Sequence, residues 1–378
     1  MLDRAKVMRE LQSISDHLFL DFSAEYAIAR TLWDKIVADP TFRNKVREVQ
    51  GKTPWLIPTW VEDLDESIAV PHEQLSYYVL AVDGSQIYPD RHQGTPCYLI
   101  NIGSVMLSYG IQTPTVHFDS VPWVYSGEQE ENIANSPDTV NGKRQELEFK
   151  IGVELSKKFQ PLAIEKQVPY VFLFDGSLIF WHLESKDQDL KDMFLSTYMA
   201  SLHQLYQTRT LIAGYISLPK NKELVNLLRL ELCNFVCDES TVTKEVDNLV
   251  DTVIADFFLE PYTRSGVFKN HASICQTYPD HLHPYFFYVH VGSEIGRIEI
   301  PAWIASDLES VNLIASIIID QSIKGRGYPV ALAESHEQAV VKGPDREFFY
   351  QLISKIGFDK NQRLRLSQKS IKKRGIGI

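Results

Sequence analysis

Residues 77–85 read YYVLAVDGS, an apolar run that ends in a carboxylate, a glycine and a hydroxyl. The run predicts a buried β-strand. The same arrangement returns at residues 171–177, which read VFLFDGS. One Asp-Gly is a common turn, but two of them, each closing a strand, predict that Asp83 and Asp175 meet at one sheet edge. Paired carboxylates at strand ends are typical of sites for hard divalent cations.

Composition sets the limits of this interpretation. The chain has 378 residues, 44% of them hydrophobic and 23% charged, which is ordinary for a globular protein with a large core and one to three domains. We expect a cytoplasmic protein, because no run of 18 apolar residues and no apolar signal segment occurs. Reduced thiols fit that compartment, and four cysteines form no dense disulfide framework: Cys97, Cys233, Cys237 and Cys275.

The net charge of −11 argues against a general nucleic-acid binder, since phosphate contacts need positive surface. The charge is uneven, however, because no acidic residue follows Asp359 and seven basic residues do. This tail is either a contact for phosphate or a partner, or a solvated terminus. No P-loop motif occurs, so a chain of this sequence that processed long DNA would need an external motor to feed it.

The order of elements predicts an α/β fold, a mixed sheet flanked by helices and compatible with a ribonuclease-H-like core. We expect an N-terminal helical extension (1–74), a core domain (75–358) and a basic tail (359–378). The expected core strands are 75–83, 98–108, 115–125, 170–175, 211–217, 285–291, 296–300 and 328–333. The expected core helices are 140–159, 187–208, 221–233, 243–258, 308–323 and one beginning near Pro344.

Other residues could complete a metal site. Glu148 follows Arg144 by one helical turn and is our third candidate ligand, although a solvent-facing pair with Arg144 is the ordinary fate of such a glutamate. Glu146 is its rival, on a different side of the same helix. His336 is expected just after strand 328–333, where it could bind metal, transfer a proton or simply cap the next helix.

Five motifs, in this order, resemble the NurA nucleases: VDGS at 82–85, RQELE at 144–148, FDGSL at 174–178, RIEIP at 297–301, and Tyr328-Pro329 followed by His336. The resemblance runs from about residue 75 to 352. It implies a ribonuclease-H-like fold and 5′→3′ exonuclease and endonuclease activity on DNA with manganese or magnesium. It also implies a homodimer that works with HerA, a hexameric DNA-translocating ATPase, in end resection. Tyr328 matches a tyrosine that the family uses near its site.

We therefore interpret the chain as a metal-dependent deoxyribonuclease acting in DNA end processing and double-strand break repair. Phosphodiester hydrolysis is well served by two metal ions, which need several carboxylates as ligands. The candidate ligands are Asp83, Glu148, Asp175 and His336. We expect DNA-backbone contacts from Arg91, Arg264 and Lys269, although Arg91 could equally pair with Asp90.

Three alternatives stay open at this stage. A catalytically silent scaffold of a motor ATPase fits the acidic net charge. A Piwi-like guide-strand binder would need a large basic groove, which the charge count disfavours. A zinc site is the third alternative, because the spacing of four residues resembles that of metal ligands: His271, Cys275, His281 and His283. The absence of a paired Cys-x2-Cys motif disfavours it.

Overall fold

The computed structural model describes residues 2–15, 22–73, 75–90, 97–126, 136–184, 186–237 and 243–360. Its strands are β1 (Thr59–Trp60), β2 (Ile68–Ala69), β3 (Tyr77–Ile87), β4 (Tyr98–Tyr109), β5 (Val116–Tyr125), β6 (Tyr170–Asp175), β7 (Leu211–Ile216), β8 (Thr263–Arg264), β9 (Phe268–Lys269), β10 (Pro284–His290) and β11 (Ile295–Pro301). Its α-helices are α1 (Arg4–Ser13), α3 (Ser23–Ala38), α4 (Phe42–Val49), α5 (Pro137–Glu165), α6 (Gln188–Gln207), α7 (Glu223–Leu232), α8 (Asp251–Ala255), α9 (Ala302–Ala305), α10 (Leu308–Lys324), α11 (Val330–Ala339) and α12 (Gly343–Asp359). Short 3-10 helices are η2 (Trp181–Leu183), η3 (Lys244–Val246), η4 (Ser273–Thr277) and η5 (Asp280–Leu282).

The described strands form one mixed sheet, in the order β1-β9-β10-β11-β7-β6-β3-β4-β5. Strands β3, β4 and β5 form an antiparallel meander, as the sequence predicts. Strand β6 then pairs parallel to β3, and β7 parallel to β6. Helix α5 connects β5 to β6 across two intervening strands, and helix α6 connects β6 to its neighbour β7; strands that run parallel need such crossovers. This confirms a mixed α/β architecture of an open sheet flanked by helices.

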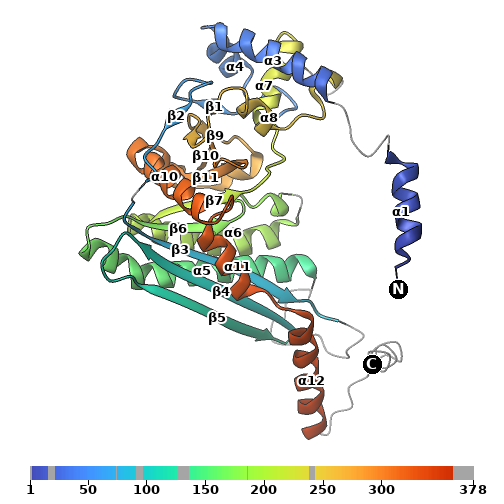
Figure 1. The fold of residues 1–378 in the computed structure, drawn as a ribbon, viewed down its shortest axis with the longest axis vertical. Coiled ribbons are helices and arrows are strands. Elements are labelled where there is room, and N and C mark those ends of the chain that lie inside the picture. Colours follow the sequence, from blue (N-terminus) through green and yellow to red (C-terminus); the bar gives the residue numbers. More distant parts are fainter. Residues whose placement is uncertain are drawn as a thin grey trace.

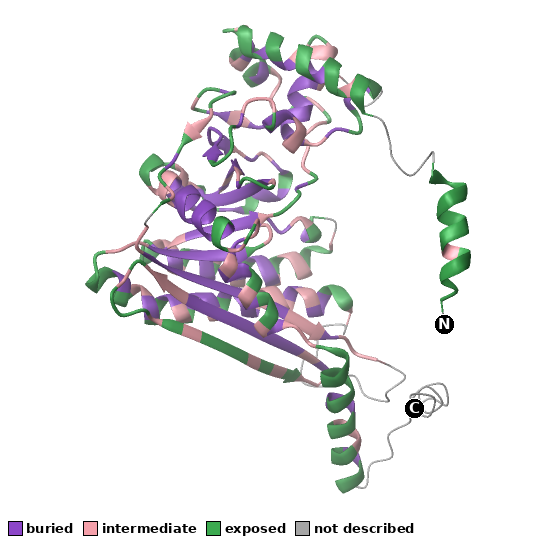
Figure 2. Ribbon diagram, in the orientation of Figure 1, coloured by how far each residue is buried: buried purple, intermediate pink, exposed green. Residues whose placement is uncertain are grey.

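Helices cover both faces of the central strands (Figure 1). Helix α5 packs on β3, β4 and β6 from one face, and α11 packs on β3 and β4 from the other. Figure 2 shows the central strands β3, β4 and β6 buried, whereas α1, α12 and the edge strand β5 are largely exposed. Nearly every residue of β3 and β6 is apolar before the aspartate, which suits strands covered on both faces.

Three sequence expectations are wrong in detail. Residues 330–339 form helix α11, where we expected a strand at 328–333. Their sequence, VALAESHEQA, is rich in good helix formers, and these outweigh the single short apolar run. The expected helix 243–258 is reduced to η3 and α8, because Val250 is extended and the Asp251 carboxylate accepts hydrogen bonds from the first amides of α7.

The third concerns Asp83, which does not end its strand. Strand β3 continues to Ile87 and stays paired with β4 through Ile87 and Leu99. Only the second triplet closes a strand: β6 ends at Asp175, and Gly176 takes a positive φ of 124°. Such a backbone conformation strongly favours glycine.

The N-terminal helices join the sheet through a second apolar core. Helices α3 and α4 share this core with α7 and α8, and Trp33 stacks on Phe258 with ring centroids 5.5 Å apart. Strand β1 pairs with β9, and β2 pairs with β8. Residues 22–73 are thus bound into the fold by both strands and helices. The domain boundary near residue 75 stays a prediction.

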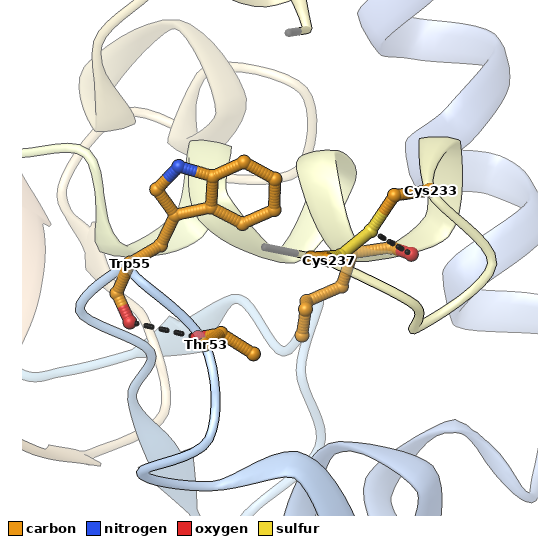
Figure 3. Close-up of a disulfide and its surroundings, with 5 residues drawn as sticks. Thr53, Trp55, Cys233 and Cys237 are labelled. Atoms are coloured by element: carbon orange, nitrogen blue, oxygen red, sulfur yellow. Dashed lines mark hydrogen bonds between the residues drawn. A yellow bond between two sulfur atoms is a disulfide. The ribbon is translucent and has the colours of Figure 1, made fainter. Parts of the chain in front are cut away.

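The expectation of four reduced thiols is wrong for one pair. Cys233 and Cys237 are joined in a disulfide beside the loop of Thr53 and Trp55 (Figure 3). Helix α7 ends at Leu232, and positive φ angles in the following residues turn the chain so that the two Cα atoms lie 5.9 Å apart. In the described part of the chain, no helix combines the length and apolar character needed to span a bilayer.

Candidate active site

Asp83 and His336 come together from a strand and a helix on the same face of the sheet. His336 Nδ1 lies 2.8 Å from Asp83 Oδ2. Helix α11 can reach this position because its last turn lies directly on Gly103 of β4. A Cβ at Gly103 would stand 2.3 Å from the Ala339 nitrogen, which no side chain could tolerate. The histidine side chain is 58% exposed, so its outer nitrogen is accessible to a substrate.

Glu148 enters from helix α5 and is almost completely buried. Its Oε1 accepts a hydrogen bond from Arg144 Nη1 at 2.9 Å. Gly84 makes room for the carboxylate, since a Cβ there would stand 2.6 Å from Glu148 Oε1. The glycine of the first triplet therefore allows a close approach between strand and helix, and does not form a turn.

Burial raises the pKa of Glu148 from 4.5 to about 8. The positive charge of Arg144 opposes this shift, whereas the negative charges of Asp83 and Asp175 add to it. Three carboxyl groups are therefore close enough to repel one another. A single guanidinium offsets part of that repulsion, at 3.9 Å from Asp83 Oδ1.

Asp175 stands at the exposed end of β6, next to β3 in the sheet. Desolvation by its surroundings still raises the pKa of its carboxyl, and the charge of Asp83 adds to the effect. A hydrogen bond with the Tyr328 side chain acts in the opposite direction. Tyr328 immediately precedes the N-cap of α11, so the same helix delivers both the tyrosine and the histidine.

The donor set suits a hard divalent cation. It offers three carboxylates and one imidazole. Burial first, and mutual repulsion second, raises the pKa of two of these carboxyls, and a bound dication would relieve the repulsion. Among the described residues, no group of three or more His, Cys, Asp or Glu side chains is already arranged as a ligand cluster. Arg144 and His336 instead take up carboxylate oxygens that a metal would use.

Glu146, the rival third ligand, points elsewhere. Its carboxylate pairs with Lys143 Nζ at 3.0 Å on the same helix. Glu148, by contrast, is close enough to Asp83 and Asp175 for their charges to raise its pKa. Geometry thus favours Glu148 as the third carboxylate.

The three residues expected to contact DNA lie in different environments. Arg91 lies outside the described residues. Arg264 is 1% exposed, and its guanidinium pairs with Glu62 at 3.2 Å and donates to Asn312 at 2.7 Å, so it cannot contact DNA. Lys269 is half-buried on β9 with its ammonium 5.9 Å from the Tyr285 ring centroid, and its contact with DNA stays a prediction.

The possible zinc ligands are engaged separately. His271 bonds to the Thr59 hydroxyl at 2.8 Å, and His283 to the Asn270 carbonyl oxygen at 2.7 Å. His281 faces the ring of His203 on α6. In the described residues these side chains do not converge on a common point.

A buried ionic group behind Asp175 is a feature that sequence reasoning did not resolve. Glu299 accepts hydrogen bonds from Ser177 Oγ at 2.7 Å and from the Leu178 amide at 2.9 Å. Arg297 in turn donates to Glu299 at 2.9 Å, and both side chains are fully buried. The period-two spacing of Arg297 and Glu299 places both side chains on one face of a strand. It could not show that this pair anchors the turn after Asp175.

Comparison with known proteins shows the family to which the chain belongs. The family model of the NurA domain matches residues 78–341, well over half of the chain. The chain belongs to the NurA family. This confirms the resemblance drawn from the motifs, and NurA is a family of nucleases. No curated protein matches the chain in sequence.

Three solved structures illustrate the similarity. A crystal structure of NurA is 13% identical, covers 82% of this chain and 94% of its own, and has a TM-score of 0.40. A NurA structure with manganese is 12% identical, with coverages of 86% and 95% and a TM-score of 0.36. A NurA structure bound to dAMP and manganese is 14% identical, with coverages of 90% and 94% and a TM-score of 0.33. Because these sequence identities and TM-scores are low, we assign roles to residues of this NurA chain from its own geometry and not from these structures.

Proposed function

We propose that this NurA protein is a divalent-metal-dependent deoxyribonuclease. It acts as a 5′→3′ exonuclease that also cuts internally, and it serves DNA end processing and double-strand break repair in the cytoplasm. One observation carries the proposal: β3, α5 and β6 bring Asp83, Glu148 and Asp175 together, with His336 bonded to the first of them. The NurA relatives solved with manganese and with dAMP support the choice of metal and substrate.

Each residue has a part in the chemistry. Asp83, Glu148 and Asp175 would hold manganese or magnesium, in two ions, with His336 as a further ligand. Bound metal supplies an activated water and stabilises charge on the phosphate. If His336 keeps its Nδ1 on Asp83, its exposed Nε2 is the atom that holds or moves a proton at the leaving oxygen.

Tyr328 and Arg144 position the carboxylates. The Tyr328 side chain is hydrogen-bonded to Asp175 and fixes its orientation. Arg144 donates to the Gly84 carbonyl oxygen at 2.9 Å as well as to Glu148, so it ties α5 to β3 at the site. Both residues therefore hold the carboxylates of Asp175 and Glu148 in place before the substrate binds.

We propose that the core is ribonuclease-H-like. The supporting observation is the local strand order β5-β4-β3-β6-β7, with two antiparallel pairs followed by two parallel ones. In this proposal residues 1–74 form an attached extension and residues 359–378 a basic tail. The protein works as a homodimer, and a HerA-type hexameric ATPase supplies the DNA translocation for which this sequence has no P-loop.

The test compares matched variants on linear DNA with manganese. Asp83→Ala is expected to lower cleavage by at least two orders of magnitude, because a first metal ligand is removed. Glu146→Gln, on the same helix as Glu148, should cleave like the wild type because Glu146 pairs with Lys143 and not with the other site residues described. Undiminished cleavage by Asp83→Ala would refute the proposal.

A catalytically silent scaffold is the second candidate function. It is favoured by Arg144, whose guanidinium already contacts Glu148 and Asp83 and offsets part of their charge without a metal. The same assay separates the two functions. A scaffold would show no metal-dependent cleavage by the purified wild type, at any manganese concentration.

A further inference from the structure

A cavity of about 530 Å³ opens beside the turn that follows Asp175. Gly176 and Ser177 form part of its wall, and Ile216, the last residue of β7, forms another part. Strands β6 and β7 are parallel, so the cavity lies at their carboxyl ends, on the same sheet edge as Asp175. Open α/β sheets bind their ligands at this edge.

The lining combines an aromatic surface with positive charge. Trp181, at the start of η2, is half-buried and packs against the main core. Lys220 is exposed, and Lys222 is half-buried with its ammonium held by the Asp247 carbonyl oxygen at 2.5 Å. Lys220 is therefore the more adaptable of the two cations.

The polar groups at the cavity floor are already satisfied by the protein. Glu223 is buried and pairs with Arg297 at 3.0 Å, so its carboxylate is already engaged by the protein. Asn226 donates to the Leu56 carbonyl oxygen at 2.8 Å. The amides at the start of α7 are taken by Asp251. An incoming ligand would therefore meet the indole and the lysines, and not the helix terminus.

An indole beside an exposed lysine is the chemistry that binds single-stranded nucleic acid, in which bases stack on aromatic rings and basic side chains follow the phosphates. We propose that this cavity binds an unpaired nucleotide of the DNA strand next to the scissile bond, with its base on Trp181 and its phosphate on Lys220. The inference rests on the proposed nuclease function and specifies its substrate as a single-stranded or frayed end. It also places a positive site in a chain of net charge −11.

Photocrosslinking tests the cavity without requiring cleavage. The full-length protein is mixed, in the presence of a chelator, with an oligothymidylate that carries 5-iodouracil at successive positions. Irradiation should link one position to the peptide that contains Trp181, as identified by mass spectrometry. Crosslinks that map only to other segments would overturn the inference.

Binding of the same oligonucleotide, measured by fluorescence anisotropy, gives a second readout. Trp181→Ala should weaken binding on the order of tenfold, whereas Trp181→Phe, which keeps a ring, should keep most of it. Lys220→Glu should weaken binding and reduce its salt dependence. The control, Lys355→Glu, makes the same charge change at an exposed position of α12 and should bind like the wild type.

The outcomes separate this inference from the proposed function. If Asp83→Ala cleaves normally but the crosslink to Trp181 persists, the nuclease site is refuted and the DNA-binding cavity stands. Equal binding of the wild type, Trp181→Ala and Lys220→Glu, each with an unchanged melting temperature, would overturn the inference. So would tighter binding of a blunt duplex than of the single strand, because a paired base cannot stack on Trp181.

Discussion

The buried carboxyl of Glu148 makes the metal-free protein less stable as pH rises. A pKa of about 8 in the folded state, against 4.5 ordinarily, corresponds to about 5 kcal/mol of cost once the group is ionised in both states. Movement of the side chain and entry of water reduce this figure. We therefore expect Glu148→Gln, which has nearly the same shape and no charge, to be about 2–4 kcal/mol more stable than the wild type at pH 8.

The sign follows from proton binding. Between pH 4.5 and about 8 the folded protein retains a proton on Glu148 that the unfolded chain has already lost. Stability falls with pH wherever the folded state binds more protons, so the wild type loses stability across this window. Glu148→Gln has no such proton to lose. The two proteins should have equal free energies of unfolding near pH 5, and the difference between these free energies should grow steadily up to pH 8.

Urea unfolding from pH 5 to pH 8, with a chelator present, measures the difference. Glu146→Gln is the control and should stay within about 0.5 kcal/mol of the wild type at every pH, because its carboxylate is paired near the surface. Saturating manganese should reverse the order, since it stabilises the protein that retains the metal ligand. A Glu148→Gln variant no more stable than wild type at pH 8 would show that the carboxyl is not buried in this way.

Three further predictions follow from individual contacts. Gly84→Ala should lower manganese affinity, measured by calorimetry, because its Cβ would stand 2.6 Å from Glu148 Oε1 and displace that carboxylate. Glu299→Gln should lower the free energy of unfolding by about 3 kcal/mol in urea, because it leaves the buried Arg297 with one carboxylate fewer. His336→Gln should reduce the cleavage rate about 10²-fold or more while the melting temperature changes little, because the side chain is largely exposed.

The sequence predicts the central strands well because their apolar runs are long and their ends are marked. It also places Asp83 and Asp175 together correctly, since β3 and β6 are parallel neighbours. It fails for α11, because a ten-residue segment that opens with Val-Ala-Leu-Ala fits a short strand as well as a helix. The geometry of His336 depends on that helix and could not be predicted without it.

Long-range contacts explain the other failures. Arg264 looks like a surface arginine in a polar loop, but its partner Glu62 lies about 200 residues earlier in the chain and draws it into the interior. No local pattern contains that information. The choice between Glu148 and Glu146 is similar. Both lie on α5 but face different sides of it, and the strand residue that gives Glu148 room, Gly84, lies about 60 residues earlier in the chain.

The two Asp-Gly-Ser triplets are alike in sequence and different in structure. In the first, the chain stays extended, and the serine hydroxyl accepts a hydrogen bond from the Val341 amide just after α11. In the second, the glycine turns the chain and Ser177 donates to the buried Glu299. The two triplets therefore share a serine that hydrogen-bonds the chain beside the aspartate, and they do not share a turn.

Both faces of the sheet contribute to the site. Helix α5 brings Glu148 over Gly84 on one face, and α11 brings His336 over Gly103 on the other. Each approach depends on a glycine in the strand beneath, because any Cβ there would push the helix away. Since burial and mutual repulsion both disfavour the charged carboxylates, packing of both helices must supply the energy that holds them together. A metal-binding site is therefore expected only in the fully packed protein, and weakening either helix contact should lower metal affinity before it unfolds the sheet.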